Sequence, residues 1–180
     1  MISNGASPGM NRLQIRVVCD AGPGIHLDEL DCLDLLSDFQ EVIVPQEVCL
    51  EIKHHRPDAL GKQGIPFIIK HAGSGFDERL WTISQTFMLD AGETEALAYM
   101  RENPDSLFLI DDASARLVAD QLGFRVHGTI AIVLRSIRRR KRKPAEVLRV
   151  VKDIPHRSTL YIKQALLAEI VLRIKSEFTL

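Results

Sequence analysis

Acidic residues follow two of the most apolar stretches of this chain, and their placement constrains the fold more than any other feature. Asp20 comes directly after residues 13–19, and the pair Asp111 and Asp112 comes directly after residues 107–110. Strands buried on both faces are apolar throughout, and parallel strands end together at one edge of their sheet. We therefore expect an open α/β sheet that gathers its functional groups at the carboxyl ends of its strands.

The remaining pattern alternates between strand-like and helix-like segments. It predicts strands at 13–19, 41–45, 107–110 and 125–127, and helices over 27–39, from Gln46, over 93–101 and 113–122, from Thr129, and over 144–152 and 158–175. Residues 56–90 are less regular, and their apolar patches at 65–69 and 80–83 predict a strand or two with a mobile loop. Such alternation is typical of a three-layer α/β/α fold with a mostly parallel central sheet. We expect a flexible leader at 1–12, one domain at 13–150, and a helical extension at 151–180 that packs on the domain or on a partner.

Composition places few limits on function, but charge clustering is informative. The formal net charge is -1 and 46% of residues are hydrophobic, so any affinity for nucleic acid must come from local clusters. One basic run is a candidate nucleic-acid track, although it could equally be a solvated helix end. Its candidate contacts are Arg135, Arg138, Arg139, Arg140 and Lys141.

The three cysteines predict a compartment. Cys19, Cys32 and Cys49 are odd in number, stand in apolar surroundings and lack Cys-x-x-Cys spacing, so we expect reduced thiols used as small core residues in the cytoplasm. No segment approaches the length of about 18 apolar residues that a membrane span needs.

A set of separated carboxylates predicts metal chemistry. Asp20, Glu51, Glu93 and the Asp111–Asp112 pair would converge if the strand ends meet. Mg²⁺ and Mn²⁺ prefer oxygen ligands of this kind, and such an ion can activate water for attack on a phosphodiester. The pattern therefore favours hydrolysis of a nucleic-acid backbone.

Five segments in a fixed order resemble one known family. They are Asp20 to Leu27, Val42 to Ile52, Leu89 to Leu97, Leu109 to Arg116 and Leu122 to Thr129. Together they resemble the PIN domain, nearest to its small prokaryotic, toxin-like branch. The resemblance implies a Mg²⁺- or Mn²⁺-dependent endoribonuclease with RNA as substrate, the toxin of a toxin–antitoxin pair in the cytoplasm. An antitoxin protein or a second copy of the chain would then be its partner.

The resemblance also implies roles for individual residues. The four acidic positions of the family fall on Asp20, on Glu51, on Glu93, and on either Asp111 or Asp112, between which the sequence does not decide. Thr129, which opens a predicted helix, falls on a polar position near the family site and could hold a water or a phosphate.

Two alternatives stay open. Gly22 and Gly24 stand where the branch usually has a hydroxyl residue and a bulky apolar residue, which makes a non-catalytic nucleic-acid-binding PIN domain credible. A phosphohydrolase of the haloacid-dehalogenase type also uses an aspartate after its first strand. It needs a second aspartate two positions later, where this chain has Gly22.

Overall fold

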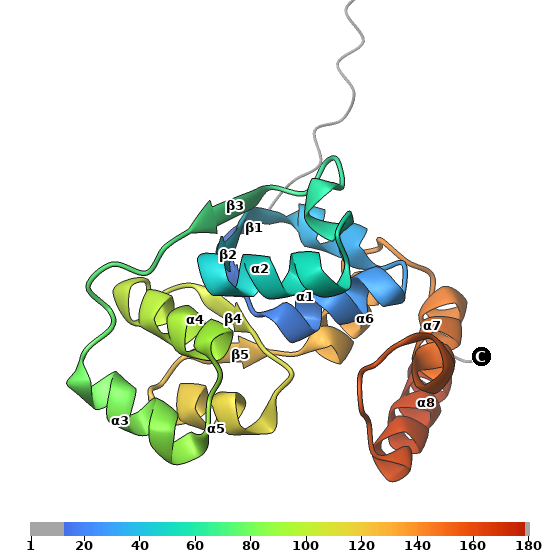
Figure 1. The fold of residues 1–180 in the computed structure, drawn as a ribbon. Coiled ribbons are helices and arrows are strands. Elements are labelled where there is room, and N and C mark those ends of the chain that lie inside the picture. Colours follow the sequence, from blue (N-terminus) through green and yellow to red (C-terminus); the bar gives the residue numbers. More distant parts are fainter. Residues whose placement is uncertain (1–12, 179–180) are drawn as a thin grey trace, which may run out of the picture.

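Five short apolar segments pair side by side in one parallel sheet, in the order β3-β2-β1-β4-β5 (Figure 1). The computed structural model of the chain describes residues 13–178. The strands are β1 (Leu13–Cys19), β2 (Phe39–Pro45), β3 (Phe67–Lys70), β4 (Leu107–Leu109) and β5 (Arg125–His127). In the central register, Val18 of β1 lies opposite Ile43 of β2 on one side and Phe108 of β4 on the other.

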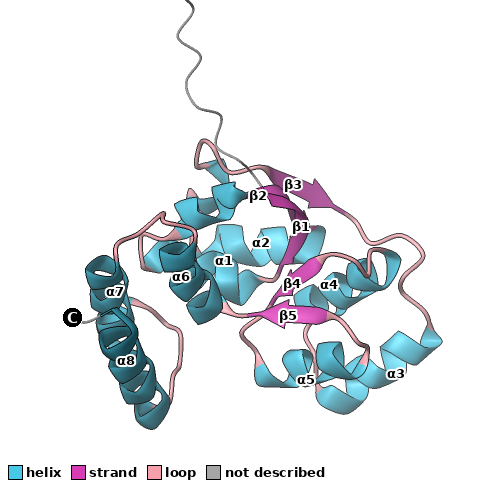
Figure 2. Cartoon of the chain, turned by 180° about the vertical axis from the view of Figure 1, so that it is seen from behind, coloured by secondary structure: helices cyan, strands magenta, loops and turns pink. Residues whose placement is uncertain are grey.

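Helices flank this sheet, and Figure 2 shows the strands in the middle of the molecule. The predicted three-layer α/β/α class is therefore confirmed. The helices are α1 (Ala21–Glu29), α2 (Gln46–His55), α3 (Glu78–Phe87), α4 (Ala91–Glu102), α5 (Ala113–Gln121), α6 (Thr129–Arg138), α7 (Pro144–Arg157) and α8 (Gln164–Phe178).

The centre of the sheet is covered on both faces. Successive residues of a strand point to opposite faces, yet Val17, Val18 and Cys19 are all fully buried. Burying each such side chain contributes on the order of 1.5–3 kcal/mol. Cys19, Cys32 and Cys49 are free and buried, as the sequence predicted. The last three residues of β1 therefore leave no room for a charged side chain until the strand ends at Asp20.

The helix predicted over 27–39 is wrong beyond Glu29. Helix α1 ends at Glu29, Asp31 adopts a left-handed backbone with φ of 53°, and Leu33–Asp38 forms a 3₁₀ helix. Leucines three residues apart suit the 3.0 residues per turn of a 3₁₀ helix as well as an α-helix. Phe39, the last member of the pattern, begins β2 instead.

The patch at 80–83 is helical rather than extended. It lies inside α3, where the Asp77 carboxylate accepts a hydrogen bond from the Leu80 amide at 2.8 Å and caps the helix. Leu80 and Ser84, four residues apart, are its buried residues. A short apolar run does not by itself distinguish a strand from a helix, and here the cap and the helical spacing decide.

The C-terminal helices are also shifted from their predicted positions. α7 continues through Pro155 to Arg157, and α8 begins only at Gln164. Between them, residues 158–163 form a linker, and the Glu29 carboxylate anchors its start by accepting hydrogen bonds from Ser158 Oγ at 2.8 Å and from the Thr159 amide at 2.7 Å. Figures 1 and 2 show α7 and α8 as a pair beside the sheet domain.

The predicted leader at 1–12 lies outside the described residues. Between residues 13 and 178, no helix combines the length and the apolar character that crossing a membrane requires.

The basic run docks onto one buried carboxylate. Asp38 is 2% exposed and pairs with Arg135 at 2.8 Å, Arg139 at 2.9 Å and Lys141 at 3.7 Å. Burial alone would raise the pKa of Asp38, but these three cations outweigh it and hold the pKa below its usual value. The Arg135 guanidinium also lies 4.5 Å from the centre of the Phe39 ring. Much of the run therefore joins α6 to the segment before β2.

Replacing Asp38 with alanine is expected to lower the free energy of unfolding by about 3–5 kcal/mol, because Arg135 would be left partly buried and unpaired. The matched control is Asp34→Ala, which removes the partner of Arg142 but involves a carboxylate that is 57% exposed. It should cost less than about 1 kcal/mol. Urea denaturation of the two variants measures the difference, and equal losses would contradict a structural role for Asp38.

Candidate functional site

The carboxyl edge of the sheet carries a cleft of about 980 Å³ at the point where the strand order reverses. The chain proceeds outward from β1 to β2 and β3, then returns to place β4 on the other side of β1. Open α/β sheets bind their ligands at such a switch point. All five acidic positions predicted from the sequence line this cleft, together with one that was not predicted: Asp20, Glu51, Asp90, Glu93, Asp111 and Asp112.

Asp20 lies at the inner end of the cleft. Its amide donates to the Leu109 carbonyl at 3.0 Å, which extends the pairing of β1 with β4 by one residue. The side chain is 5% exposed, and it forms no ion pair among the described residues. The strand pairing thus fixes a buried carboxylate at the switch point.

Glu93 is held by a helix cap. Asp90 caps α4 by accepting from the Glu93 amide at 2.8 Å, and the Glu93 carboxylate accepts from the Asp90 amide at 3.0 Å. This capping box brings a second acid into the cleft. Asp90 was not predicted as a site residue, although the Asp-x-x-Glu spacing of a capping box is present in the sequence.

Asp111 is the centre of a hydrogen-bond network. Its Oδ1 accepts from the Thr129 amide at 2.8 Å, and its Oδ2 accepts from Thr129 Oγ1 at 2.6 Å. His26 Nδ1 lies 2.8 Å from the same Oδ2. Thr129 is fully buried and reaches the site through Asp111, whereas His26 lines the cleft itself. The sequence contained no signal for His26, because only the tertiary fold brings α1 beside the end of β4.

Asp112 has a different local role. Its Oδ1 caps α5 by accepting from the Ser114 amide at 2.8 Å and the Ala115 amide at 2.9 Å. Its Oδ2 makes no hydrogen bond within residues 13–178, so one oxygen of this exposed carboxylate stays available. The two neighbouring aspartates thus differ clearly in how many of their acceptor sites are occupied.

The cleft is electrostatically unfavourable as it stands. Burial and the charges of Glu93, Asp90 and Glu51 raise the pKa of Asp20 well above its usual value. Burial, with Asp90, Asp112 and Glu51, raises the pKa of Glu93 to about 7. The pKa of Glu51 is raised as well, by burial and then by Asp90. The carboxylates repel one another, and a cation in the cleft would relieve this repulsion.

The two unusual glycines have specific surroundings. A Cβ on Gly24 would lie 2.7 Å from Ile52 Cδ1, so the close packing of α1 on α2 leaves no space there for the bulky residue that the family resemblance led us to expect. A Cβ on Gly22 would make ordinary contacts, 3.5 Å from His26 and 3.6 Å from Asp111. A serine hydroxyl would therefore fit at Gly22, beside Asp111.

The cations at the cleft are not those of the basic run. The predicted contacts Arg135, Arg138, Arg139, Arg140 and Lys141 do not line it. Two cations from elsewhere do, namely Arg116 of α5 and Lys163 at the end of the 158–163 linker. Neither residue was singled out from the sequence, because each stands alone in its segment.

The side chains are not arranged as a ready metal cage. Within residues 13–178, no three of the Asp, Glu, His or Cys side chains form a group that could hold a metal ion. Several of the cleft carboxylates are instead engaged by amides and hydroxyls, as described above.

Sequence comparison agrees with the geometry. The family model described as a PIN domain matches residues 16–176 of the chain. The chain belongs to the PIN domain family. PIN domains are generally nucleases, so the broad class of activity is nuclease. The match includes α7 and most of α8. No curated protein and no solved structure matches the chain significantly.

Replacing Glu93 with glutamine is expected to stabilise the protein at pH 8 in the absence of divalent ions, by about 1–3 kcal/mol. Its pKa is about 7 when folded against an ordinary 4.5, so the folded state retains the proton between these values. Wild-type stability therefore falls as pH rises through this window, and the variant removes that loss. Below pH 4.5 the two proteins should unfold alike.

Chemical denaturation at pH 4 and pH 8 in EDTA measures this prediction. A difference between wild type and Glu93→Gln that is the same at both pH values would contradict it.

Proposed function

We propose that this PIN domain hydrolyses RNA phosphodiesters internally, with Mg²⁺ or Mn²⁺ as its cofactor. One observation carries the proposal: acids from four separate segments of the chain line a single cleft at the switch point of the sheet. Asp20 follows β1, Glu51 lies on α2, Glu93 opens α4, and the Asp111–Asp112 pair follows β4.

The donor set suits a hard divalent cation. Asp20, Glu51 and Glu93 offer only oxygen ligands, their pKa values are raised, and no lysine or arginine of the described chain pairs with any of the three. Such crowding is stabilised by a divalent ion that prefers carboxylates and keeps some of its waters. When bound, the ion would lower the pKa of a water and stabilise negative charge on the phosphate.

The protein groups have separable roles in this proposal. Asp20, Glu51 and Glu93 would hold the ion, because all three carboxylates line the cleft and have raised pKa values. Thr129 and His26 keep Asp111 oriented through their hydrogen bonds to its two oxygens.

Of the two neighbouring aspartates, we propose Asp112 as the ligand. Its Oδ2 is available while its Oδ1 caps α5, and its charge is one of those that raise the pKa of Glu93. Asp111 already accepts from Thr129 twice and contacts His26, so we assign it the task of shaping the cleft wall.

A role as a toxin restrained by an antitoxin is the biological form of the same proposal. The partly exposed apolar stripe of α8 supports it: Leu166 and Leu172 are exposed, and Ile174 is buried. A partner helix or a second copy of the chain would cover these residues.

Purified protein with Mn²⁺ is expected to cleave a mixed pool of single-stranded and structured RNA. EDTA should abolish cleavage, and Asp20→Asn should lower the rate at least about 100-fold, since it removes the most buried carboxylate of the site. Gel electrophoresis of end-labelled RNA measures both effects.

Intact RNA with retained binding would overturn the hydrolase proposal and favour a nucleic-acid-binding PIN domain. The absence of a hydroxyl at Gly22 is the observation that favours this second function. A Gly22→Ser variant, for which the structure has space, would then be the first to test for a gain of cleavage.

Asp112→Asn is expected to lose activity while remaining folded, because asparagine caps a helix as well as aspartate does. Asp112→Ala should lose both activity and about 1 kcal/mol of stability. Thermal unfolding followed by circular dichroism separates the two effects. Full cleavage by Asp112→Asn would contradict the assignment of this residue as a ligand.

A further inference from the structure

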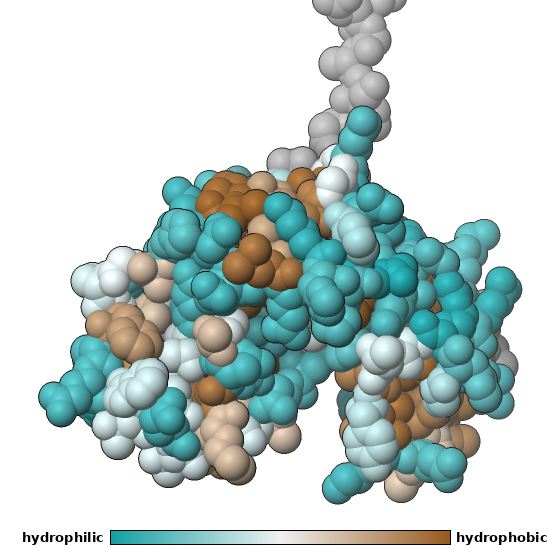
Figure 3. Space-filling model, viewed as in Figure 1, coloured by the Kyte–Doolittle hydropathy of each residue, from teal (hydrophilic) through white to brown (hydrophobic). Residues whose placement is uncertain are grey.

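The cleft has a second wall that contains no acid. It faces the carboxylates and is built from α6, the 158–163 linker and α8. Its residues are mostly apolar or aromatic: Ile130, Ala131, Leu134, Leu160, Tyr161, Ile162, Lys163, Leu166 and Ile170. Figure 3 shows the notch between the sheet domain and the α7–α8 pair, with hydrophobic side chains at the surface of that pair.

Tyr161 is the prominent feature of this wall. It is 83% exposed although it lines the cleft, so its ring contributes almost nothing to the packed core. The linker that carries it is nevertheless held in place, because Glu29 accepts hydrogen bonds from Ser158 and Thr159. The structure thus fixes the backbone near an aromatic ring that has no packing role.

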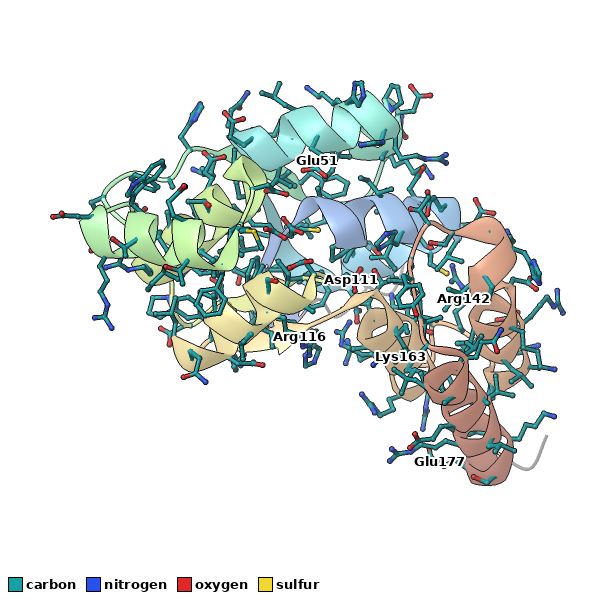
Figure 4. The ribbon with its side chains drawn as sticks, turned by 60° about the horizontal axis from the view of Figure 1, so that its bottom comes forward. Glu51, Asp111, Arg116, Arg142, Lys163 and Glu177 are labelled. Carbon is teal, nitrogen blue, oxygen red and sulfur yellow. The ribbon has the colours of Figure 1, made fainter. Side chains whose placement is uncertain are left out.

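Two cations line the same cleft as Tyr161, and their side chains have no partner among the described residues. The side chains of Lys163 and Arg116 make no hydrogen bond or ion pair within residues 13–178, in contrast to Arg135 and Lys141, which are paired with Asp38. Figure 4 shows Arg116 on α5 and Lys163 before α8, on either side of the opening next to Asp111. Unpaired positive charge next to an acidic site is suited to a phosphate chain that must approach the carboxylates.

Resting on the nuclease function proposed above, we propose that Tyr161, Lys163 and Arg116 form the site that holds the substrate strand across the acidic cleft. Tyr161 stacks on a base, and Lys163 and Arg116 contact phosphates that flank the bond to be cut. A base that stacks on a side chain must be unpaired, so the substrate class is a single-stranded segment of RNA.

A pair of exposed aromatic side chains elsewhere on the surface lacks nearby positive charge. Phe76 and Trp81 contact each other beside a hollow of about 470 Å³ that adjoins Asp90. Its lining includes Asp90 and Glu95 but no lysine or arginine among the described residues. An RNA strand bound there could stack on aromatic rings, but no positive charge would contact its phosphates. The wall that carries Tyr161 is therefore the better site.

The test measures binding separately from cleavage. Fluorescence anisotropy is recorded with a fluorescein-labelled 12-nucleotide RNA, single-stranded or annealed to its complement, on the full chain carrying Asp20→Asn to prevent cleavage. Tyr161→Ala should weaken binding of the single strand about 5- to 150-fold, the range for loss of one stacked base. Tyr161→Phe, which keeps the ring, should bind as the parent does.

The charge contacts have their own readout. Lys163→Gln should weaken binding and lower the slope of log affinity against log salt by about 0.7, as expected for one lost phosphate contact on a single strand. The matched control is Lys152→Gln, which removes an exposed lysine of α7 that does not line the cleft and should leave both quantities unchanged.

The outcomes distinguish this inference from the proposed function. If the wild-type chain cleaves RNA but Tyr161→Ala and Lys163→Gln bind like the parent, the nuclease stands and the second wall is overturned. If no RNA is cleaved but the single strand binds through Tyr161 and Lys163, the proposed RNA-binding site is supported and the proposed hydrolase function is overturned. Equal affinity for the duplex, or loss of binding in Tyr161→Phe, would contradict stacking. Because Tyr161 and Lys163 are exposed, the variants should fold normally.

Discussion

Repulsion between carboxylates at the end of a buried sheet is the constraint on which the rest of this structure depends. Val17, Val18 and Cys19 at the end of β1 are fully buried, so the first position after them that can carry a charge is Asp20. The reversal of strand order then places the end of β4 beside it, the first turn of α4 adds Glu93, and the middle of α2 adds Glu51. Each addition raises the pKa of its neighbours. A cation would reduce the repulsion between these carboxylates, and a divalent cation is what the nuclease function proposed for this chain requires.

The fold keeps its positive charges out of the inner cleft. The basic run, which as a sequence looks like a track for nucleic acid, is largely engaged by Asp38 and Asp34 in joining α6 and the turn after it to the 3₁₀ segment before β2. If it were instead beside Asp20, it would neutralise the carboxylates and leave a metal ion without its ligands. The cations that reach the cleft, Arg116 and Lys163, stand next to the acids without an ion pair, where a phosphate backbone could still meet them.

Capping explains how short polar motifs place carboxylate oxygens in the cleft. Asp90 and Glu93 satisfy each other at the start of α4, and Asp112 satisfies two amides at the start of α5. These caps stabilise helices whose first turns lie at the sheet edge, so the same residues serve local structure and the site. These hydrogen bonds occupy part of each carboxylate. Within residues 13–178 the acids therefore line one cleft without being arranged to enclose a metal ion.

What the sequence determined by itself was the sheet, the class of fold and the acids that follow its strands, because apolar runs and the charges that interrupt them are local properties. The positions and types of helices were harder to predict. Leucines three residues apart suit both a 3₁₀ helix and an α-helix, and the apolar patch at 80–83 lies in a helix that Asp77 caps. Only the tertiary structure decided the partners of the basic run, the contact of His26 with Asp111, and the meeting of the 158–163 linker with the acidic cleft. His26 and Asp111 are 85 positions apart, and Arg135 and Asp38 are 97 apart. Contacts between such distant residues, like the meeting of the linker with the cleft, depend on how whole elements pack rather than on any local pattern.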